Sequence, residues 1–170
     1  YAADEASADA LRAERADFEK VHRAGGKVFV AGYTDSFEIV GDLLDLPVFA
    51  GQPDPALAEA YHSVGSKILS YANPQGGVEE PETYRRNFGL SLWKAGYDGA
   101  CTYAYQHSFG HAWDDYDDPT YRDHNMAYPT VNGVIPTVQW EGYREGYDDL
   151  RYLATLERWI ERGQQRGGTA

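Results

Sequence analysis

The chain has 170 residues, of which 42% are hydrophobic and 14% aromatic, so it can fold around a sizeable core. Its formal net charge of −12 argues against nucleic-acid partners and anionic membrane surfaces, because both need clustered Lys and Arg. The single cysteine, Cys101, excludes an internal disulfide, and no hydrophobic run approaches the roughly 20 residues that span a bilayer.

The chain opens on two adjacent carboxylates, Asp4 and Glu5, without a signal-peptide pattern before them. The carboxylates are either solvent-facing charges of a tail or a catalytic pair at the end of a strand that begins upstream. Residues 6–23, rich in Ala, Arg and Glu, predict a helix that stops at Gly25 and Gly26. Residues 27–33, short and β-branched, predict a buried strand.

The next elements repeat this alternation. Asp35 and Glu38 have the spacing of a capping box for a short helix through residue 44, and residues 46–51 read as a strand. Asp54 and Pro55 predict the start of a helix through about residue 64. Residues 67–72 are the third strand.

The second half of the chain is more aromatic. Tyr84, Phe88 and Leu92, at four-residue spacing, predict a helix that ends near residue 96, and a strand follows over residues 99–106. A long aromatic and acidic loop leads to about residue 136. Apolar residues at helical spacing then predict a final helix over residues 138–162, and the Gly-rich segment 163–170 reads as a flexible tail.

Four strands that alternate with helices predict an α/β fold with parallel pairing. A complete (β/α)8 barrel needs about 250 residues, so the pattern favours the C-terminal half of such a barrel as one domain over residues 1–162. Residues 1–5 would then end the fourth strand, and the four clear strands would be the fifth to the eighth. A doubly wound open sheet is the alternative, although no G-x-G-x-x-G or Walker-type loop follows any strand.

Two segments carry a resemblance to a known family. Residues 83–106, "TYRRNFGLSLWKAGYDGACTYAYQ", and residues 132–159, "NGVIPTVQWEGYREGYDDLRYLATLERW", resemble the closing segments of barrels similar to family 123 glycoside hydrolases. These are β-N-acetylgalactosaminidase-like enzymes and uncharacterised relatives. The first segment resembles the last strand with the helix before it, and the second resembles the final helix.

The resemblance implies roles for the two carboxylates. Such families have an Asp-Glu pair at the end of the fourth strand, and Asp4-Glu5 stands at the matching place. By this resemblance Asp4 orients the acetamido group of a β-N-acetylhexosaminide, which acts as the nucleophile, and Glu5 is the general acid and base. Adjacent residues of an extended strand point to opposite faces, so we expect a twist or bulge that brings both to the site.

Barrel enzymes place their sites at the C-terminal ends of the strands, where a sugar pocket needs aromatic faces and hydrogen-bonding groups. The alternative for the strand tyrosines is packing in the barrel interior. The residues expected to contact substrate are Tyr33, Asn73, Tyr103, Tyr105, His107, Trp113 and, near the start of the last helix, Glu141.

No metal or other cofactor is expected. His107, His111, His124 and the acids of residues 114–118 share one loop, but their spacing matches neither an HExxH helix nor an EF-hand, so solvated loop acids are favoured over calcium or zinc sites. Cys101 lies in an apolar run and is expected to be a buried structural thiol. Glu141, Arg144, Glu145, Asp148 and Arg151 lie three or four apart and predict an ion-pair lattice.

A half-barrel leaves two strand edges unpaired, so we expect a homodimer or association with the missing half. The expected ligand is a carbohydrate. Hydrolysis of another glycoside and a non-catalytic sugar-binding or structural module are the alternatives. The sequence indicates no compartment, and a secreted or periplasmic location is compatible with the complete protein.

Overall fold

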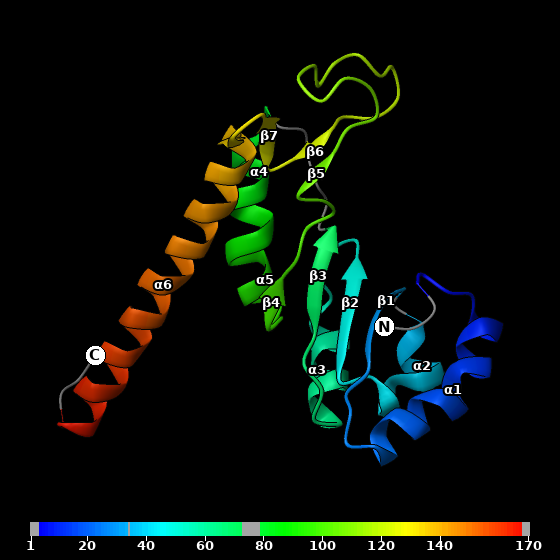
Figure 1. Ribbon diagram of the computed structural model, residues 1–170. Helices are drawn as coiled ribbons and strands as arrows, with labels where there is room; N and C mark the ends of the chain where they lie inside the picture. The colour runs from blue at the N-terminus through cyan, green and yellow to red at the C-terminus, as the bar shows by residue number, and fades with distance from the viewer. Residues whose placement is uncertain (1–3, 34, 73–78, 168–170) are drawn as a thin grey trace. The chain divides into compact units, whose positions relative to one another are not determined.

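A computed structural model of the chain describes residues 4–33, 35–72 and 79–167. The chain divides into two compact units, the first made of residues 1–75 and 91–105 and the second of residues 76–90 and 106–170. Figure 1 shows the helices and strands of both units. The expected domain of residues 1–162 takes in parts of both.

The first unit contains a four-stranded parallel sheet. Its strands lie side by side in chain order (Figure 1): β1 (Phe29–Gly32), β2 (Leu46–Ala50), β3 (Leu69–Ala72) and β4 (Gly99–Ala100). Helices separate these strands along the chain, which confirms the expected α/β class with a parallel sheet.

Strand β4 is shorter than the strand predicted over residues 99–106. It pairs with β3 only through Leu69 with Gly99 and Ser70 with Ala100. The N–H of Cys101 donates one further hydrogen bond to the carbonyl of Ser70 at 2.7 Å. The next strand begins only at Gln106, in the second unit. The apolar run predicted a longer strand because residue type alone does not reveal where the partner backbone diverges.

The helices of the first unit start largely where the sequence predicts. Ser7 caps the first of them with its hydroxyl, and Asp54 accepts a hydrogen bond from the N–H of Ala56 at 2.9 Å. The helical segments are α1 (Ala8–Arg23), α2 (Ser36–Val40), the 3-10 turn η1 (Gly41–Leu43), α3 (Pro55–Ser63) and α5 (Ser91–Lys94).

The prediction of a capping box at Asp35 is wrong. Asp35 precedes α2, but its backbone is helical (φ −72°, ψ −8°) and its side chain makes no capping hydrogen bond. A side-chain cap needs extended backbone at this position, because only then does the carboxylate face the free N–H groups of the first turn.

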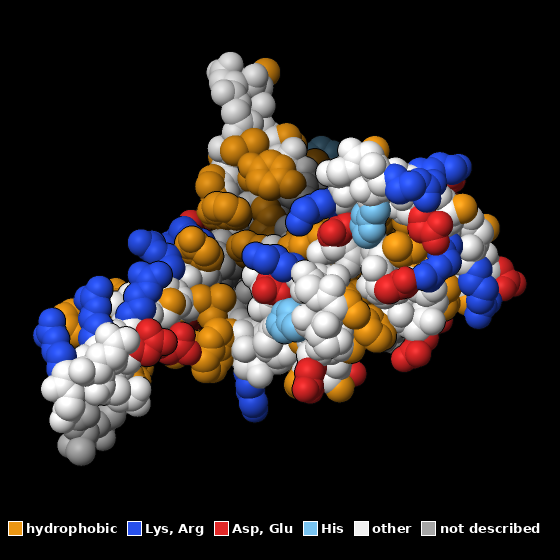
Figure 2. Space-filling model, turned by 90° about the horizontal axis from the view of Figure 1, so that it is seen from below, with side chains coloured by type: hydrophobic (Ala, Val, Ile, Leu, Met, Phe, Trp, Pro, Cys, Tyr) orange, Lys and Arg blue, Asp and Glu red, His pale blue; other side chains and the backbone are white. Residues whose placement is uncertain are grey.

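The core of the first unit lies between the sheet and its helices. Tyr61 of α3 is fully buried, with the ring of Phe37 edge-on at 4.8 Å and the ring of Phe49 at 5.6 Å. The other buried members are Leu11, Phe18, Val28, Val30, Val40, Leu43, Leu44, Leu57, Ala58 and Ile68. On the outer surface, basic and acidic side chains are interspersed at the right of Figure 2, where α1 lies. Within α1, Lys20 pairs with Asp17 at 2.6 Å.

Two histidine–aspartate bridges join the segments that lead into the strands. In the first bridge, Asp45 Oδ2 accepts the backbone N–H of Val28 at 2.7 Å and lies 2.8 Å from His22 Nε2. The segment before β2 is thereby tied to the segment before β1. Burial alone would raise the pKa of Asp45, but these two hydrogen bonds outweigh it and lower the pKa.

The second bridge repeats the first one along the sheet. Asp98 Oδ2 accepts the N–H of Ile68 at 2.9 Å and lies 2.9 Å from His62 Nε2. Here too the two hydrogen bonds outweigh burial, and the pKa of Asp98 is lowered. Each histidine stands six residues before its partner N–H, in the last turn of a helix. Each of these helices is followed by a glycine in the left-handed conformation, at Gly25 and Gly65. His22 and His62 therefore have a structural role at this end of the sheet.

The second unit is built around a long helix, α6 (Val138–Gln165), which packs on α4 (Pro81–Arg85) and η2 (Arg86–Leu90). Helix α6 extends three residues into the segment expected as a tail. Arg85 binds both carboxylate oxygens of Asp149, at 2.7 and 2.9 Å, and Glu145 at 2.8 Å. Phe88 stacks on Tyr84 at 5.4 Å.

Glycines allow the helices of the second unit to approach closely. A Cβ added to Gly142 would lie 2.0 Å from the carbonyl oxygen of Pro81, and one added to Gly146 would lie 2.7 Å from that of Arg85. Gly89 faces the backbone of Gly146 and has non-helical angles (φ −110°, ψ −107°). The helix predicted up to residue 96 is therefore broken at Gly89.

Short antiparallel ladders occupy part of the region expected to be a long loop. The first pairs β5 (Gln106–His107) with β6 (His124–Asn125). The second pairs β7 (Ala127–Thr130) with β8 (Gly133–Pro136), joined at Val131-Asn132. The Asn132-Gly133 pair is a turn signal that could have indicated this hairpin.

None of the helices in the described ranges combines the length and the apolar composition needed to cross a membrane.

Candidate functional site

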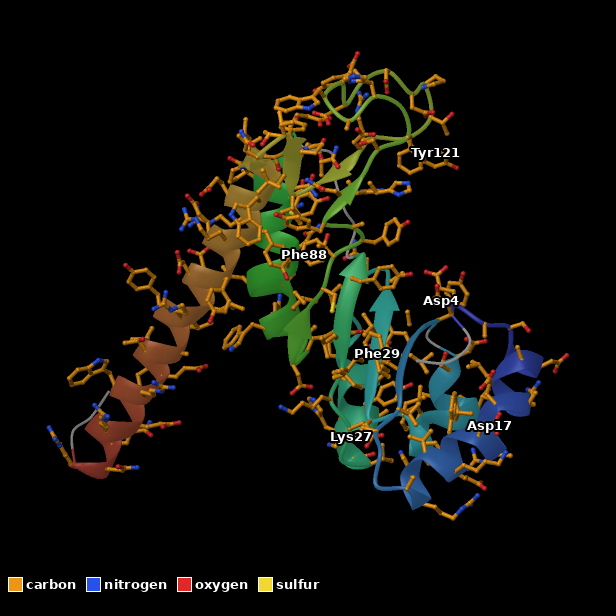
Figure 3. The ribbon with its side chains drawn as sticks, in the orientation of Figure 1. Asp4, Asp17, Lys27, Phe29, Phe88 and Tyr121 are labelled. Carbon is orange, nitrogen blue, oxygen red and sulfur yellow. The ribbon has the colours of Figure 1, made fainter. Side chains whose placement is uncertain are left out.

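The predicted catalytic pair lies at the C-terminal end of β1. Figure 3 shows Asp4 at the end of the sheet toward which the strand arrows point, and Lys27 at the opposite end. The backbone N–H of Glu5 donates to the carbonyl of Ala31 in β1 at 2.9 Å. The short segment before α1 is thereby bonded to the outer edge of the sheet.

Tyr33 fixes the side chain of Glu5. It follows β1 directly, and its hydroxyl donates a hydrogen bond to Glu5 Oε2 at 3.1 Å. This hydrogen bond, the charge of Glu5, burial and the charge of Asp4 all raise the pKa of Tyr33. The phenol therefore stays protonated as a hydrogen-bond donor, and Tyr33, Glu5 and Asp4 form one electrostatic group.

The backbone at Glu5 departs from the extended geometry of a strand. Its φ of 44° lies in the left-handed region, which non-glycine residues adopt uncommonly. Glu5 and Asp4 lie in a turn, and both are exposed to solvent. Strained backbone of this kind costs on the order of 1–3 kcal/mol and is found most often at functional sites.

Two further predicted residues follow β4 in the first unit. Tyr103 and Tyr105 are each about half exposed, at 50% and 55%, so neither is packed in a sheet interior. Cys101 is half-buried, and burial raises the pKa of its thiol, which keeps it protonated and unreactive. Asn73, the remaining candidate on this sheet, lies outside the described residues.

The last three predicted residues belong to the second unit. His107 lies in β5, with its ring edge-on to Phe109 at 4.7 Å. Trp113 is half exposed and stacks on Tyr128, with ring centroids 5.0 Å apart. Glu141 accepts a hydrogen bond from Arg144 at 2.8 Å.

The carboxylate of Glu141 thus belongs to the ion-pair lattice that its spacing predicted. Arg144 also binds Asp148 at 2.9 Å, and Arg151 binds Asp148 at 3.1 Å. These contacts favour a structural role for Glu141 on the surface of α6.

The acids of the loop before β6 hold turns together. Asp118 accepts the N–H groups of Thr120 and Tyr121, both at 2.8 Å, and this lowers its pKa. Asp114 accepts the N–H of Tyr116 at 3.2 Å. Within the described residues, no group of three or more His, Cys, Asp or Glu side chains is arranged to hold a metal ion.

One pair of residues in this loop was missed by the sequence analysis. Tyr128 donates its hydroxyl to Asp115 Oδ2 at 2.5 Å, and Asp115 is buried, with 8% of its surface exposed. The run of acids around Asp115 reads as solvated loop, and the tyrosine lies 13 residues further on. Only the fold brings the two together.

Comparison with protein-family models found no match, and comparison with curated proteins found no significant match.

Proposed function

We propose that this chain is the C-terminal half of a (β/α)8 glycoside hydrolase barrel, which hydrolyses a β-N-acetylhexosaminide by a substrate-assisted retaining mechanism. The main support is the position of Asp4 and Glu5 at the C-terminal end of a parallel sheet, where Glu5 is bonded to Ala31 and Tyr33. This is the end at which barrel enzymes carry their catalytic groups.

The order of the strands also supports a half-barrel. Parallel strands in consecutive order, each connected through helical segments, form the repeating unit of such barrels. The backbone bond from Glu5 to Ala31 lies where a preceding strand would join β1. The other half of the barrel, or a second copy of this chain, would pair with the outer edges of β1 and β4.

The proposed reaction has two steps on opposite faces of the sugar carbon C1. The acetamido oxygen of the substrate attacks C1 as the glycosidic C–O bond breaks, and Glu5 gives its proton to the leaving oxygen. Asp4 orients the acetamido group and stabilises the positive charge that develops on it. Water then attacks C1, the bond to the acetamido oxygen breaks, and the Glu5 carboxylate takes the proton from that water.

Tyr33 has a positioning role in this scheme. Its hydroxyl holds one oxygen of Glu5, so the other oxygen can face the glycosidic bond. A fixed carboxylate lowers the cost of ordering the acid in the transition state.

The test is hydrolysis of aryl β-N-acetylgalactosaminide and aryl β-N-acetylglucosaminide by the complete protein. Glu5→Gln should lower turnover about 10²–10⁴-fold, because amides cannot transfer a proton in this way. Glu59→Gln, an exposed change on α3, is the matched control and should leave turnover unchanged. A complete protein that cleaves neither substrate, or an active Glu5→Gln variant, would refute the proposal.

A thiazoline analogue of N-acetylgalactosamine tests the mechanism separately, since it mimics the cyclised acetamido intermediate. It should inhibit an enzyme that uses the acetamido oxygen. Cleavage of the N-acetylhexosaminides without such inhibition would refute the use of the acetamido oxygen as nucleophile.

A further inference from the structure

A buried carboxylate holds the loop of residues 108–123, which connects β5 to β6, against strand β7 (Figure 1). This carboxylate belongs to Asp115, which is 8% exposed and accepts the hydroxyl of Tyr128, a residue of β7, at 2.5 Å. The ring of Trp113 stacks on the ring of Tyr128 at 5.0 Å, so the loop and the strand also share an aromatic contact. We call these three residues the clasp.

The carboxylate in the clasp is incompletely hydrogen-bonded. Asp115 Oδ1 is buried and has no hydrogen-bond partner among the described residues. Asp123, a buried acid of the same loop, shows the contrast, because its two oxygens accept from the N–H of Phe109 and the amide of Asn125. Burial without a donor on each oxygen disfavours the charged form of a carboxyl group.

The charges around Asp115 do not compensate for this burial. Arg122, the only Arg or Lys among residues 108–123, forms its ion pair with Glu79 at 3.3 Å. The acidic side chains that face Asp115 are Asp123, in the same loop, and Glu79, in the segment before α4. Both carry the same charge as an ionised Asp115, so both disfavour its ionisation.

Two polar groups act in the other direction on Asp115. The hydroxyl of Tyr128 and the amide of Asn125 both favour the charged form. The Asn125 amide, however, donates its hydrogen bonds to Ser108 at 3.3 Å and Asp123 at 3.2 Å. Burial is the largest influence, and together with the like charges it raises the pKa of Asp115.

A raised pKa links the stability of the clasp to pH. The closed clasp binds a proton more tightly than an open one, in which Asp115 is surrounded by water. The stability gained from this proton is fully present below the unfolded pKa of about 4 and is lost as the pH rises through the higher folded value.

We propose that the clasp is a pH switch, which is closed more firmly when Asp115 carries a proton and opens more often when Asp115 is charged. Opening separates Trp113 from Tyr128 and releases the loop from β7. The switch goes beyond the proposed function, because it requires no catalytic role for Glu5.

Two other groups of this region respond to pH in the opposite sense. Burial and the charge of His107 lower the pKa of His124, and backbone hydrogen bonds lower the pKa of Asp118. The stability that depends on these two groups is lost as the pH falls. Because Asp115→Asn leaves both groups in place, a comparison of this variant with the wild type isolates the effect of Asp115.

The experiment is hydrogen exchange of the complete protein, measured by mass spectrometry between about pH 4.5 and pH 7.5, with each rate divided by its intrinsic value. The readout is the protection of residues 108–124 in the wild type divided by that in Asp115→Asn. This ratio should fall at least about threefold as the pH rises. The ratio for residues 8–23, in the first unit, should stay constant.

Two further variants sharpen the test. Asp114→Asn is the matched control, because Asp114 is the exposed neighbour of Asp115, and its pH dependence should be that of the wild type. Tyr128→Phe keeps the ring that stacks on Trp113 but removes the hydroxyl that favours the charged carboxylate. Its protection should therefore fall more steeply with pH than that of the wild type, and this result does not depend on how Asn fits at position 115.

Three outcomes would overturn the proposal. The first is a ratio of wild type to Asp115→Asn that is constant, or that rises, over this pH range. The second is a pH dependence that Asp114→Asn also removes, since the titrating group would then be exposed. The third is a Tyr128→Phe variant whose protection depends less on pH than that of the wild type.

Discussion

The two ends of the parallel sheet use their carboxylates differently. At the N-terminal end, Asp45 and Asp98 each accept hydrogen bonds from a backbone N–H and a histidine ring. At the C-terminal end, Asp4 and Glu5 are exposed, and Tyr33 positions Glu5. Asp45 and Asp98 thus connect the segments that lead into the strands, whereas Asp4 and Glu5 remain accessible to a ligand.

This difference agrees with the general division of labour in α/β folds. The N-terminal end of a parallel sheet contributes to stability, whereas the C-terminal end carries the groups that act on ligands. Substitutions at the two ends should therefore separate into losses of stability and losses of turnover. The predictions below test this separation, under the function proposed above.

Among the further substitutions, Asp4→Asn should have the largest effect, and this effect is on turnover. Loss of the charge that stabilises the cyclising acetamido group should lower kcat about 10²–10³-fold, as for other preorganised electrostatic groups. The free energy of unfolding should change by less than about 0.5 kcal/mol, because Asp4 is exposed. Hydrolysis assays and urea unfolding of the complete protein measure the two quantities. A large fall in stability would contradict the distinction between the sheet ends.

The next effect is that of Asp98→Ala on stability. The N–H of Ile68 and the ring of His62 lose their acceptor, so the free energy of unfolding should fall by about 2–3 kcal/mol. Turnover should stay within about twofold of wild type at temperatures where the variant is folded. Asp17→Ala is the matched control. Asp17 pairs with Lys20 on the surface of α1, so its removal should cost less than about 1 kcal/mol.

A smaller effect is expected from acid. The folded-state pKa values of Asp45 and Asp98 are lowered, so the unfolded chain binds more protons as the pH falls. The stability that they contribute is fully present above the unfolded pKa of about 4 and is lost as the pH falls through the lower folded values. Urea unfolding as a function of pH should show this slope. The double variant Asp45→Asn, Asp98→Asn should flatten it, and an unchanged slope would mean that other carboxylates dominate.

The smallest expected effect is that of Tyr33→Phe. Glu5 keeps its carboxylate but loses the hydroxyl that orients it, so kcat should fall about tenfold while KM changes little. Tyr103→Phe is the control for loss of an exposed hydroxyl at the same end of the sheet, and it should act on KM if that tyrosine contacts substrate. Equal effects of the two variants on kcat would argue against a special role for Tyr33.

Local patterns in the sequence predicted the elements of the first unit well. Short, largely apolar runs marked β1, β2 and β3, and Asp54-Pro55 marked the start of α3. These signals are local because strand and helix propensities depend on residues a few positions apart. The parallel order of the strands followed from the alternation of strands with helices.

Interactions between distant residues escaped the sequence analysis. His22 meets Asp45 across 23 positions, and His62 meets Asp98 across 36, so neither histidine has a local signal for its partner. The break at Gly89 depends on the backbone of Gly146, which approaches within contact distance only after the helices pack. Such contacts are properties of the folded chain.

Some features of the candidate site were likewise predictable from the sequence, and others depend on the tertiary structure. The sequence by itself determined that two carboxylates precede four strands and helices, and that aromatic residues follow the strands. Only the tertiary structure decided that Glu5 takes a left-handed backbone, bonds to Ala31 and receives the hydroxyl of Tyr33. It also decided that Asp115 is buried against Tyr128, because burial and hydrogen-bond partners arise from how distant segments pack.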